Sequence, residues 1–305
     1  MLSNAKKHRL NKTILRGYRL NGRKLPWRNT TDPYKILVSE VMLQQTQVSR
    51  VLSKYRQFLR QFPTLRSLAR AKQRDVIIAW QGMGYNNRAV RLHRLARTVT
   101  SQDRKTIRGD YESLLNLPGI GKYTANAILS FAFRRDVPVV DTNVRRVLSR
   151  LLWRMRSFGE LADQKIIWRT AATFLPKGRS YEWNQALMDL GATICTARAP
   201  RCNECRVESL CASSRSMVRP ATRQRRREPS FNGMPNRIYR GRIIELLRRR
   251  NGRGPMNVAQ LRKELLGKSG KRSERWLHLV LSSLQRDGLV NLKGEGTRSA
   301  RVALA

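Results

Sequence analysis

Apolar residues recur every three to four positions along most of the chain up to residue 211, which is the spacing of one buried face of an α-helix. One such stripe runs through residues 34–62 and consists of Val41, Val48, Leu52, Tyr55 and Leu59. The same period predicts further helices in LRSLARA, RDVIIAWQGM, NNRAVRLHRLARTVT, TNVRRVLSRLLW, ADQKIIWRTAATFL and YEWNQALMDLGATIC. Alternating apolar and polar residues are scarce, so this part is expected to be an all-α body of about ten helices.

A Pro-Gly-x-Gly turn at residues 118–121 interrupts the helical pattern. Pro118 restricts φ, while Gly119 and Gly121 permit positive φ, so residues 117–122 are expected to form a tight hairpin before a helix over residues 124–133. Backbone N–H groups at a glycine-lined helix start bind anions, phosphate above all. Most such turns merely connect elements, so the turn alone leaves both interpretations open.

The pattern changes at residue 213. Residues 213–236 are rich in Arg, Pro and Ser and poor in apolar residues, which predicts a linker. Residues 237–305 then predict three helices, in RIYRGRIIELLRRR, in NVAQLRKELL and over about 273–287, followed by a β-hairpin in GLVNLKGEGTRSARVALA. Three helices and a hairpin describe a small winged-helix domain. Its expected role is DNA contact, with protein docking as the alternative.

The charge of the chain is strongly unbalanced, with 63 Lys and Arg against 20 Asp and Glu and a formal charge of +43. Such an excess predicts a polyanionic partner, with nucleic acid the first candidate and an anionic membrane surface or a general basic adaptation the alternatives. No apolar run approaches the ~18 to 20 residues of a membrane span, and the N-terminal residues lack the apolar core of a secretion signal. We therefore expect a cytoplasmic, nucleoid-associated protein.

All four cysteines, Cys195, Cys202, Cys205 and Cys211, lie in one segment with the spacing C-x6-C-x2-C-x5-C. Disulfides would be unusual in a reducing compartment, so this segment predicts a metal site. Zinc sites more often use two C-x2-C pairs, and only one is present. Four thiolates on a compact loop also hold a [4Fe-4S] cluster, which the spacing favours over zinc.

Three stretches occur together: PWRNTTDPYKILVSEVMLQQTQV, NLPGIGKYTANAILSFAF with VPVVDTNVRRVLSR, and the four-cysteine segment. Over about residues 10–212 this combination resembles the helix-hairpin-helix (HhH-GPD) DNA glycosylases with an iron-sulfur cluster, and SEVMLQQTQV, GMGYNNRA and WNQALMDLGA resemble their adenine glycosylase (MutY) branch. The resemblance implies a two-lobed all-α fold over residues 1–212, with a six-helix lobe at about 30–135 and a cluster lobe from residues 1–29 and 136–212.

The resemblance also implies an activity. A monomeric enzyme of base excision repair is expected to act on double-stranded DNA with a mismatched or damaged base pair. It would remove adenine opposite 8-oxoguanine or guanine by hydrolysing the N-glycosidic bond, with a [4Fe-4S] cluster as its cofactor.

Two carboxyl groups occupy the positions of the family's catalytic pair. Glu40 matches the acid that protonates the departing purine, which requires an apolar pocket that raises its pKa; Val41 and Met42 would supply one. Without the resemblance, the first interpretation of Glu40 would be part of a solvated polar face. Asp141 matches the carboxylate that stabilises the sugar cation, a role compatible with capping the following helix, and Asn143 matches the residue that orients the pair.

The resemblance assigns DNA contacts as well. Glu40 is expected near the start of its helix, with Gln44 one turn further along the same face. Gln44 and Gln45 match residues that wedge into the duplex around the mismatch. Tyr85 matches a tyrosine that inserts on the side of the base opposite adenine, although a core aromatic beside Trp80 is the alternative.

The hairpin residues distinguish this branch from its lyase relatives. Gly119 and Gly121 would let the hairpin grip the DNA backbone. Tyr123 stands where endonuclease III has a nucleophilic lysine, and a phenol cannot form a Schiff base. Lys122 is about 100° away around the helix and is expected to contact phosphate. A monofunctional glycosylase without lyase activity is therefore expected.

Two departures from the family keep alternatives open. The tail is not the NUDIX-like domain that helps common members recognise 8-oxoguanine, and VDTN stands in place of the usual VDGN. A mismatch thymine or uracil DNA glycosylase is therefore one alternative. A non-enzymatic iron-sulfur DNA-binding regulator is the other, although it would have no use for Glu40 and Asp141.

Overall fold

The computed structural model describes all of the chain except residues 1–2, 102–105, 156, 158–159, 215–227, 251–253, 268–269 and 295–298. The chain divides into two compact units. The first contains Met1–Leu37, Arg108–Asn116 and Ile120–Gln224, and the second contains Val38–Ile107, Leu117–Gly119 and Arg225–Ala305. No helix in the described parts of the chain is long and apolar enough to cross a membrane.

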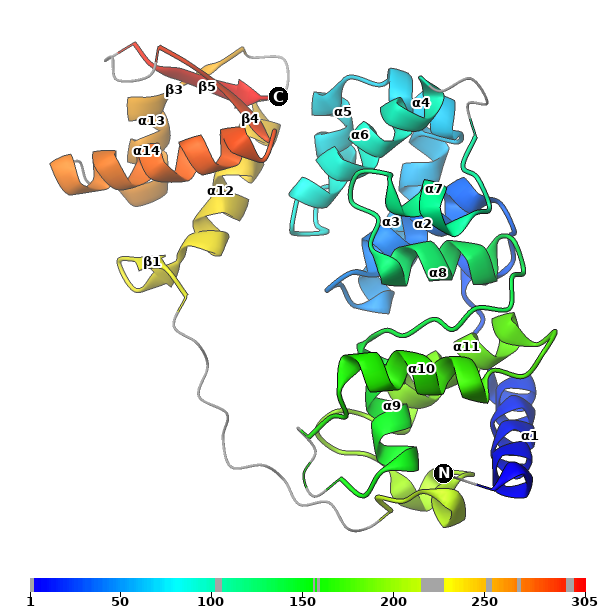
Figure 1. Ribbon diagram of the computed structural model, residues 1–305. Coiled ribbons are helices and arrows are strands. Elements are labelled where there is room, and N and C mark those ends of the chain that lie inside the picture. The colour runs from blue at the N-terminus through cyan, green and yellow to red at the C-terminus, as the bar shows by residue number, and fades with distance from the viewer. Residues whose placement is uncertain are drawn as a thin grey trace. The chain divides into compact units, whose positions relative to one another are not determined.

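The first unit is helical (Figure 1). Its α-helices are α1 (Asn4–Asn21), α7 (Tyr111–Leu115), α8 (Lys122–Phe131), α9 (Thr142–Leu152), α10 (Gln164–Phe174) and α11 (Ser180–Thr193). The four-cysteine segment adds two short 3-10 turns, Cys202–Glu204 and Glu208–Leu210. The apolar faces of α1, α9, α10 and α11 enclose one core, in which Trp183 and Val147 are almost fully buried. Helix α1, capped by Ser3, was not among the predicted helices.

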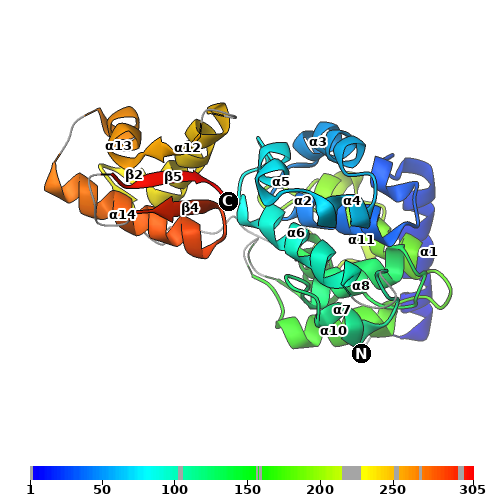
Figure 2. The ribbon, with the colours of Figure 1, turned by 90° about the horizontal axis from the view of Figure 1, so that it is seen from above.

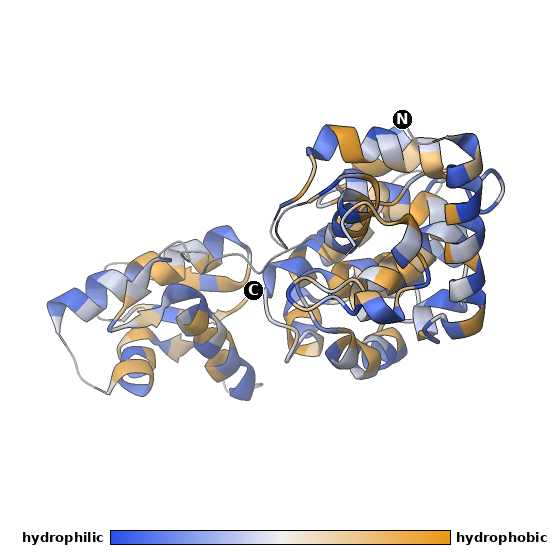
Figure 3. Cartoon of the chain, turned by 90° about the horizontal axis from the view of Figure 1, so that it is seen from below, coloured by the Kyte–Doolittle hydropathy of each residue, from blue (hydrophilic) through white to orange (hydrophobic). Residues whose placement is uncertain are grey.

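The second unit contains α3 (Val48–Gln61), α4 (Leu65–Arg70), α5 (Gln73–Ala79) and α6 (Asn87–Thr100). Helix α2 (Pro33–Leu43) is divided between the units after Leu37. The single stripe expected over residues 34–62 is therefore wrong: α2 ends at Leu43, and α3 begins only at Val48. The other helical segments predicted before residue 211 are confirmed. Helices of the chain carry both orange apolar and blue polar residues, as Figure 3 shows.

The C-terminal segment belongs to the second unit. It contains β1 (Ser230–Phe231), β2 (Met234–Pro235), α12 (Asn236–Arg249), β3 (Met256–Asn257), α13 (Val258–Leu266), α14 (Lys271–Arg286), β4 (Val290–Lys293) and β5 (Arg301–Leu304) (Figure 2). The three predicted helices and the β4–β5 hairpin are confirmed, and β3 completes an antiparallel sheet with the order β3–β5–β4. The predicted linker, residues 213–236, lies largely outside the described residues, and its last part contains the small β1–β2 hairpin.

The C-terminal segment and helices α5 and α6 share one hydrophobic core. Ile77 of α5 and Val90 of α6 are buried in the same cluster as Ile244, Leu281 and other apolar residues of α12 to α14. The Gln73 side-chain amide also donates a 2.8 Å hydrogen bond to the carbonyl oxygen of Gly288. The segment therefore packs as part of the second unit.

Candidate active site

Glu40 lies in the last turn of α2, not near the helix start as the sequence suggested. Only 4 % of it is exposed, and its neighbours Val41 and Met42 are buried as well. Burial among apolar residues disfavours the charged form of a carboxyl group. The Glu40 side chain is therefore almost entirely removed from solvent.

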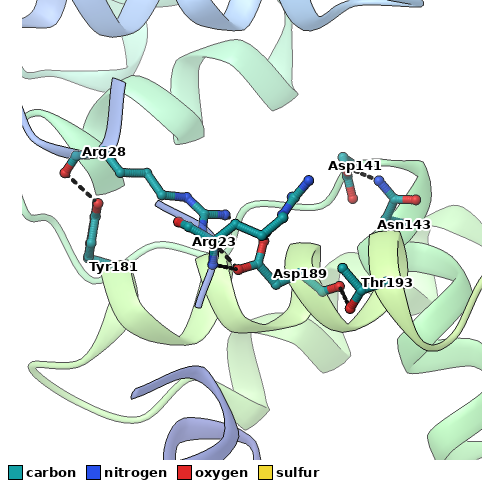
Figure 4. A network of polar contacts seen from close by, with 7 residues as sticks. All are labelled: Arg23, Arg28, Asp141, Asn143, Tyr181, Asp189 and Thr193. Atoms are coloured by element: carbon teal, nitrogen blue, oxygen red, sulfur yellow. Dashed lines mark hydrogen bonds and ion pairs between the residues drawn. The ribbon is translucent and has the colours of Figure 1, made fainter. Parts of the chain in front are cut away.

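Asp141 caps the N-terminus of α9, as the sequence predicted. Its Oδ1 accepts a 2.6 Å hydrogen bond from the Val144 backbone N–H, and its Oδ2 accepts a 2.9 Å bond from Nδ2 of Asn143 (Figure 4). Burial raises the pKa of Asp141, while these hydrogen bonds and the nearby charge of Arg146 oppose that shift. The carboxyl group is thus fixed in one orientation and held by groups that favour its ionised form.

Arg146 links the Asp141–Asn143 pair to the cysteine segment. Its Nη2 donates to Oδ1 of Asn143 at 2.8 Å and to the Gly191 carbonyl at 2.7 Å. Its Nε donates to the carbonyl oxygen of Cys195 at 2.8 Å. One guanidinium group therefore holds Asn143 against α11 and the first cysteine.

The four cysteines line one pocket in the first unit. Each is a half-buried free thiol, and Nη1 of the fully buried Arg150 donates to Sγ of Cys195 at 3.5 Å. Burial raises the pKa of Cys205 to about 11 and also raises that of Cys211, and in both cases the other cysteines add to the shift. The thiols of Cys205 and Cys211 are thus protonated at neutral pH unless a metal centre displaces their protons.

The other residues that are expected to contact DNA lie in two loops of the second unit. Gln44 and Gln45 lie in the non-helical stretch between α2 and α3, so the expectation that Gln44 shares a helical face with Glu40 is wrong. Gln45 is exposed and has φ +56°, and Tyr85 is 54 % exposed with φ +43°. Positive φ is uncommon outside glycine and is concentrated at functional sites. Because more than half of Tyr85 is exposed, it is not a core aromatic residue.

The early end of α2 has a tertiary cause. Nη1 of Arg88, from α6, donates to three carbonyl oxygens around the helix end, those of Val41, Met42 and Gln44. These carbonyls would otherwise accept from a following helical turn or from water. The period of the sequence continues through the break, so only the three-dimensional contact could reveal it.

The Pro-Gly-x-Gly turn precedes α8, which starts at Lys122. Gly119 has φ +85°, but Gly121 has φ −107° and caps α8, so only Gly119 adopts the positive φ that both glycines permit. Tyr123 is half-buried and packs on the small core that includes Phe131. The Lys122 ammonium lies 4.3 Å from the ring centroid of Trp168 and so makes a cation–π contact.

One ionic group of the first unit was not among the predicted site residues. Asp189 of α11 accepts hydrogen bonds from Arg23 and Arg28 at 2.6–2.9 Å, while the Tyr181 hydroxyl donates to the Arg28 carbonyl (Figure 4). Burial acts to raise the pKa of Asp189, but the arginines outweigh it and lower the pKa. Arg28 in PWRN and Asp189 in WNQALMDLGA could have indicated this ion pair, since charged side chains in otherwise apolar segments need partners.

Comparison with known proteins agrees with the fold and the motifs. Residues 38–168 match the HhH-GPD superfamily of base excision DNA repair proteins. The chain is 36% identical to the adenine DNA glycosylase of Mycobacterium tuberculosis (strain CDC 1551 / Oshkosh), over 95% of both chains. It is 39% identical to the adenine DNA glycosylase of Mycolicibacterium smegmatis, over 93% of this chain and 92% of the relative. The human adenine DNA glycosylase is 39% identical over 73% of this chain and 42% of its own length.

Solved structures agree as well. The structure of a thermostable thymine-DNA glycosylase is 32% identical with a TM-score of 0.62, and the match covers 68% of this chain and 96% of that one. A non-covalent endonuclease III–DNA complex shares the fold at 22% identity, with a TM-score of 0.60 over 71% of this chain and 97% of the other. Because the mycobacterial relatives match the chain over nearly its whole length, the chain belongs to the adenine DNA glycosylase family of HhH-GPD base excision repair proteins.

Proposed function

We propose that this protein removes adenine mispaired with 8-oxoguanine or guanine by hydrolysing its N-glycosidic bond. The observation that carries the proposal is the fixed Asp141, held by Val144 and Asn143, in a chain that also keeps a buried Glu40. Glu40 protonates the departing base, and Asp141 stabilises the positive charge that develops on the sugar. Two carboxyl groups in different protonation states are what glycosidic cleavage requires.

The test is a panel of four duplexes, carrying A opposite 8-oxoguanine, A opposite G, T opposite G and U opposite G. Each is incubated with the protein and then treated with hot alkali, which cleaves abasic sites. Cleavage of the first two alone supports adenine removal, and Glu40→Gln should abolish it while DNA binding persists. The thymine-DNA glycosylase likeness makes T or U removal the second candidate, and cleavage of the G·T or G·U duplex would select it. Cleavage of none would favour a DNA-binding regulator.

The enzyme is proposed to be monofunctional, so that it leaves an abasic site and does not cut the strand. Tyr123 has no amine, and the amine of Lys122 is engaged by Trp168 on the neighbouring helix α10. Borohydride treatment during the reaction traps Schiff bases. We expect little covalent adduct with the wild-type protein, and a strong adduct that disappears in Lys122→Ala would contradict the proposal.

The four cysteines are proposed to hold a [4Fe-4S] cluster. No three His, Cys, Asp or Glu side chains in the described residues lie close enough to bind one metal ion. The four thiols that line one pocket are the ligand set that a [4Fe-4S] cluster would take. When bound, the cluster would tie the cysteine segment together and would order the basic residues of its loop. Metal and sulfide analysis of the purified protein decides between iron and zinc.

The remaining features complete the proposal. Gln44, Gln45 and Tyr85 contact the bases around the mismatch, and the hairpin at Gly119 and Gly121 binds the backbone. The partner is duplex DNA, as for the related structure solved in complex with it. The basic C-terminal segment is proposed to add DNA contacts, which predicts a steep loss of affinity with salt.

A further inference from the structure

Arg88 makes an unusual number of contacts for one side chain. It lies in the first turn of α6 and is only 6 % exposed. Its two terminal nitrogens donate six hydrogen bonds of 2.5–3.1 Å. The acceptors are the carbonyl oxygens of Val41, Met42, Gln44, Met83 and Gly84 and the hydroxyl of Thr46.

No carboxylate in the described residues forms an ion pair with this guanidinium group. A buried charge without a counter-ion is costly unless hydrogen bonds compensate it. Burial lowers the pKa of Arg88 to about 10, which still leaves it charged at neutral pH. Five neutral carbonyl oxygens and the Thr46 hydroxyl therefore surround a permanent positive charge at this place.

The acceptors fall into two groups that are far apart in the sequence. Nη1 binds the end of α2 and the loop at residues 44–46, while Nη2 binds Thr46 and the loop at residues 83–85. The guanidinium carbon also lies 5.8 Å from the ring centroid of Tyr85. A planar fork spans two loops in fixed geometry, which the single nitrogen of lysine cannot do.

We propose that Arg88 is a positioning residue that joins the 44–46 and 83–85 loops into one pre-formed wedge for the mismatched duplex. The inference rests on the proposed function, in which these loops contact the bases. Each loop contains an exposed residue with positive φ, Gln45 in one and Tyr85 in the other. Without the clamp both loops must become ordered when DNA binds, which weakens recognition of the mismatch.

The test compares the affinity for a duplex carrying A opposite 8-oxoguanine with that for the same duplex without the lesion. Arg88→Lys keeps the charge but not the fork, and Thr46→Val removes one acceptor from a part-exposed position. Arg179→Lys is the matched control, because Arg179 pairs with Glu182 within the first unit, outside both loops. We expect Arg88→Lys to lower the preference for the lesion at least about tenfold, or about 1.4 kcal/mol, with affinity for the undamaged duplex and the control unchanged.

A double mutant distinguishes positioning from general support. If Arg88 acts through the wedge, adding Tyr85→Ala to Arg88→Lys should cost less than Tyr85→Ala costs alone. If Tyr85→Ala lowers the preference but Arg88→Lys and Thr46→Val do not, the inference is overturned. If Arg88→Lys does not fold, an unchanged preference in Thr46→Val overturns it. A wild-type protein without preference or adenine release would instead refute the proposed function.

Discussion

Replacing Gly191 with alanine tests whether the contact between α11 and α9 sets the active-site geometry. A Cβ atom at Gly191 would lie 2.7 Å from Cβ of Asn143, 3.2 Å from its carbonyl oxygen and 3.2 Å from Cγ2 of Val147. Carbon atoms in ordinary contact are about 3.5–4.0 Å apart. Since Cβ of Asn143 is fixed to the backbone, the two helices must separate locally by about 1 Å. That displacement moves the side chain that orients Asp141.

The two effects of this change differ in size. Alanine gains about 1 kcal/mol of helix propensity over glycine, whereas overpacking a close contact costs about 1–3 kcal/mol. The free energy of unfolding should therefore fall by only about 0–2 kcal/mol. The rate of adenine release should fall far more, about 100-fold, because a displacement near 1 Å in a group that positions the reaction has that effect.

The assay is single-turnover release of adenine at saturating enzyme, with thermal unfolding measured in parallel. Gly241→Ala is the matched control, since Gly241 is also helical, in α12, and a Cβ there meets nothing within 4 Å. The control should gain stability, about 0.5–1 kcal/mol, and should keep the wild-type rate. A Gly191→Ala protein that also keeps this rate would refute the reasoning.

Three further predictions concern charged side chains. Burial raises the pKa of Asp141, so its ionised form is lost as pH falls through a value above the usual ~3.9. The single-turnover rate of adenine release should fall over the same pH range. A rate that falls only at or below pH ~4 would contradict this prediction. The pKa of Asp189 is lowered because Arg28 and Arg23 outweigh the effect of its burial. The ionised Asp189 therefore stabilises the folded state above pH ~4, and this contribution is lost as pH falls through the lowered pKa. Asp189→Asn should accordingly cost about 3–5 kcal/mol of unfolding free energy at pH 7 and less in acid; an equal loss at both pH values would argue against the ion pairs. Nε and Nη2 of Arg248 donate hydrogen bonds to the Ile77 carbonyl oxygen near the end of α5. Arg248→Met should therefore lower the free energy of unfolding, measured by denaturant titration, by about 1–3 kcal/mol. An unchanged free energy of unfolding would show that this contact is dispensable.

The sequence contained most of the fold. Helical period identified the long amphipathic helices and the three helices of the C-terminal segment, because each buries one face in a core. It failed between α2 and α3, where apolar residues keep their spacing across a break. It also missed α1, whose few buried residues stand among many charged ones.

The motifs identified the candidate site residues but did not predict the structural environment of each one. Asp141 was expected as a helix cap and is one, because capping depends on residues close in the sequence. The roles of Glu40, Asn143, Tyr123 and the four cysteines stay predictions that the proposed experiments test. The domain boundaries expected from the resemblance likewise stay predictions.

What the sequence by itself determined are the local properties: helix periods, the capping carboxylate, the glycine turn and the grouping of the cysteines. Only the tertiary structure decided which distant groups meet. Arg88 reaches two loops about forty residues apart in the chain, and Arg146 joins Asn143 to Cys195. A long side chain contacts whatever the fold brings within its reach, and that depends on packing between elements and not on neighbouring letters.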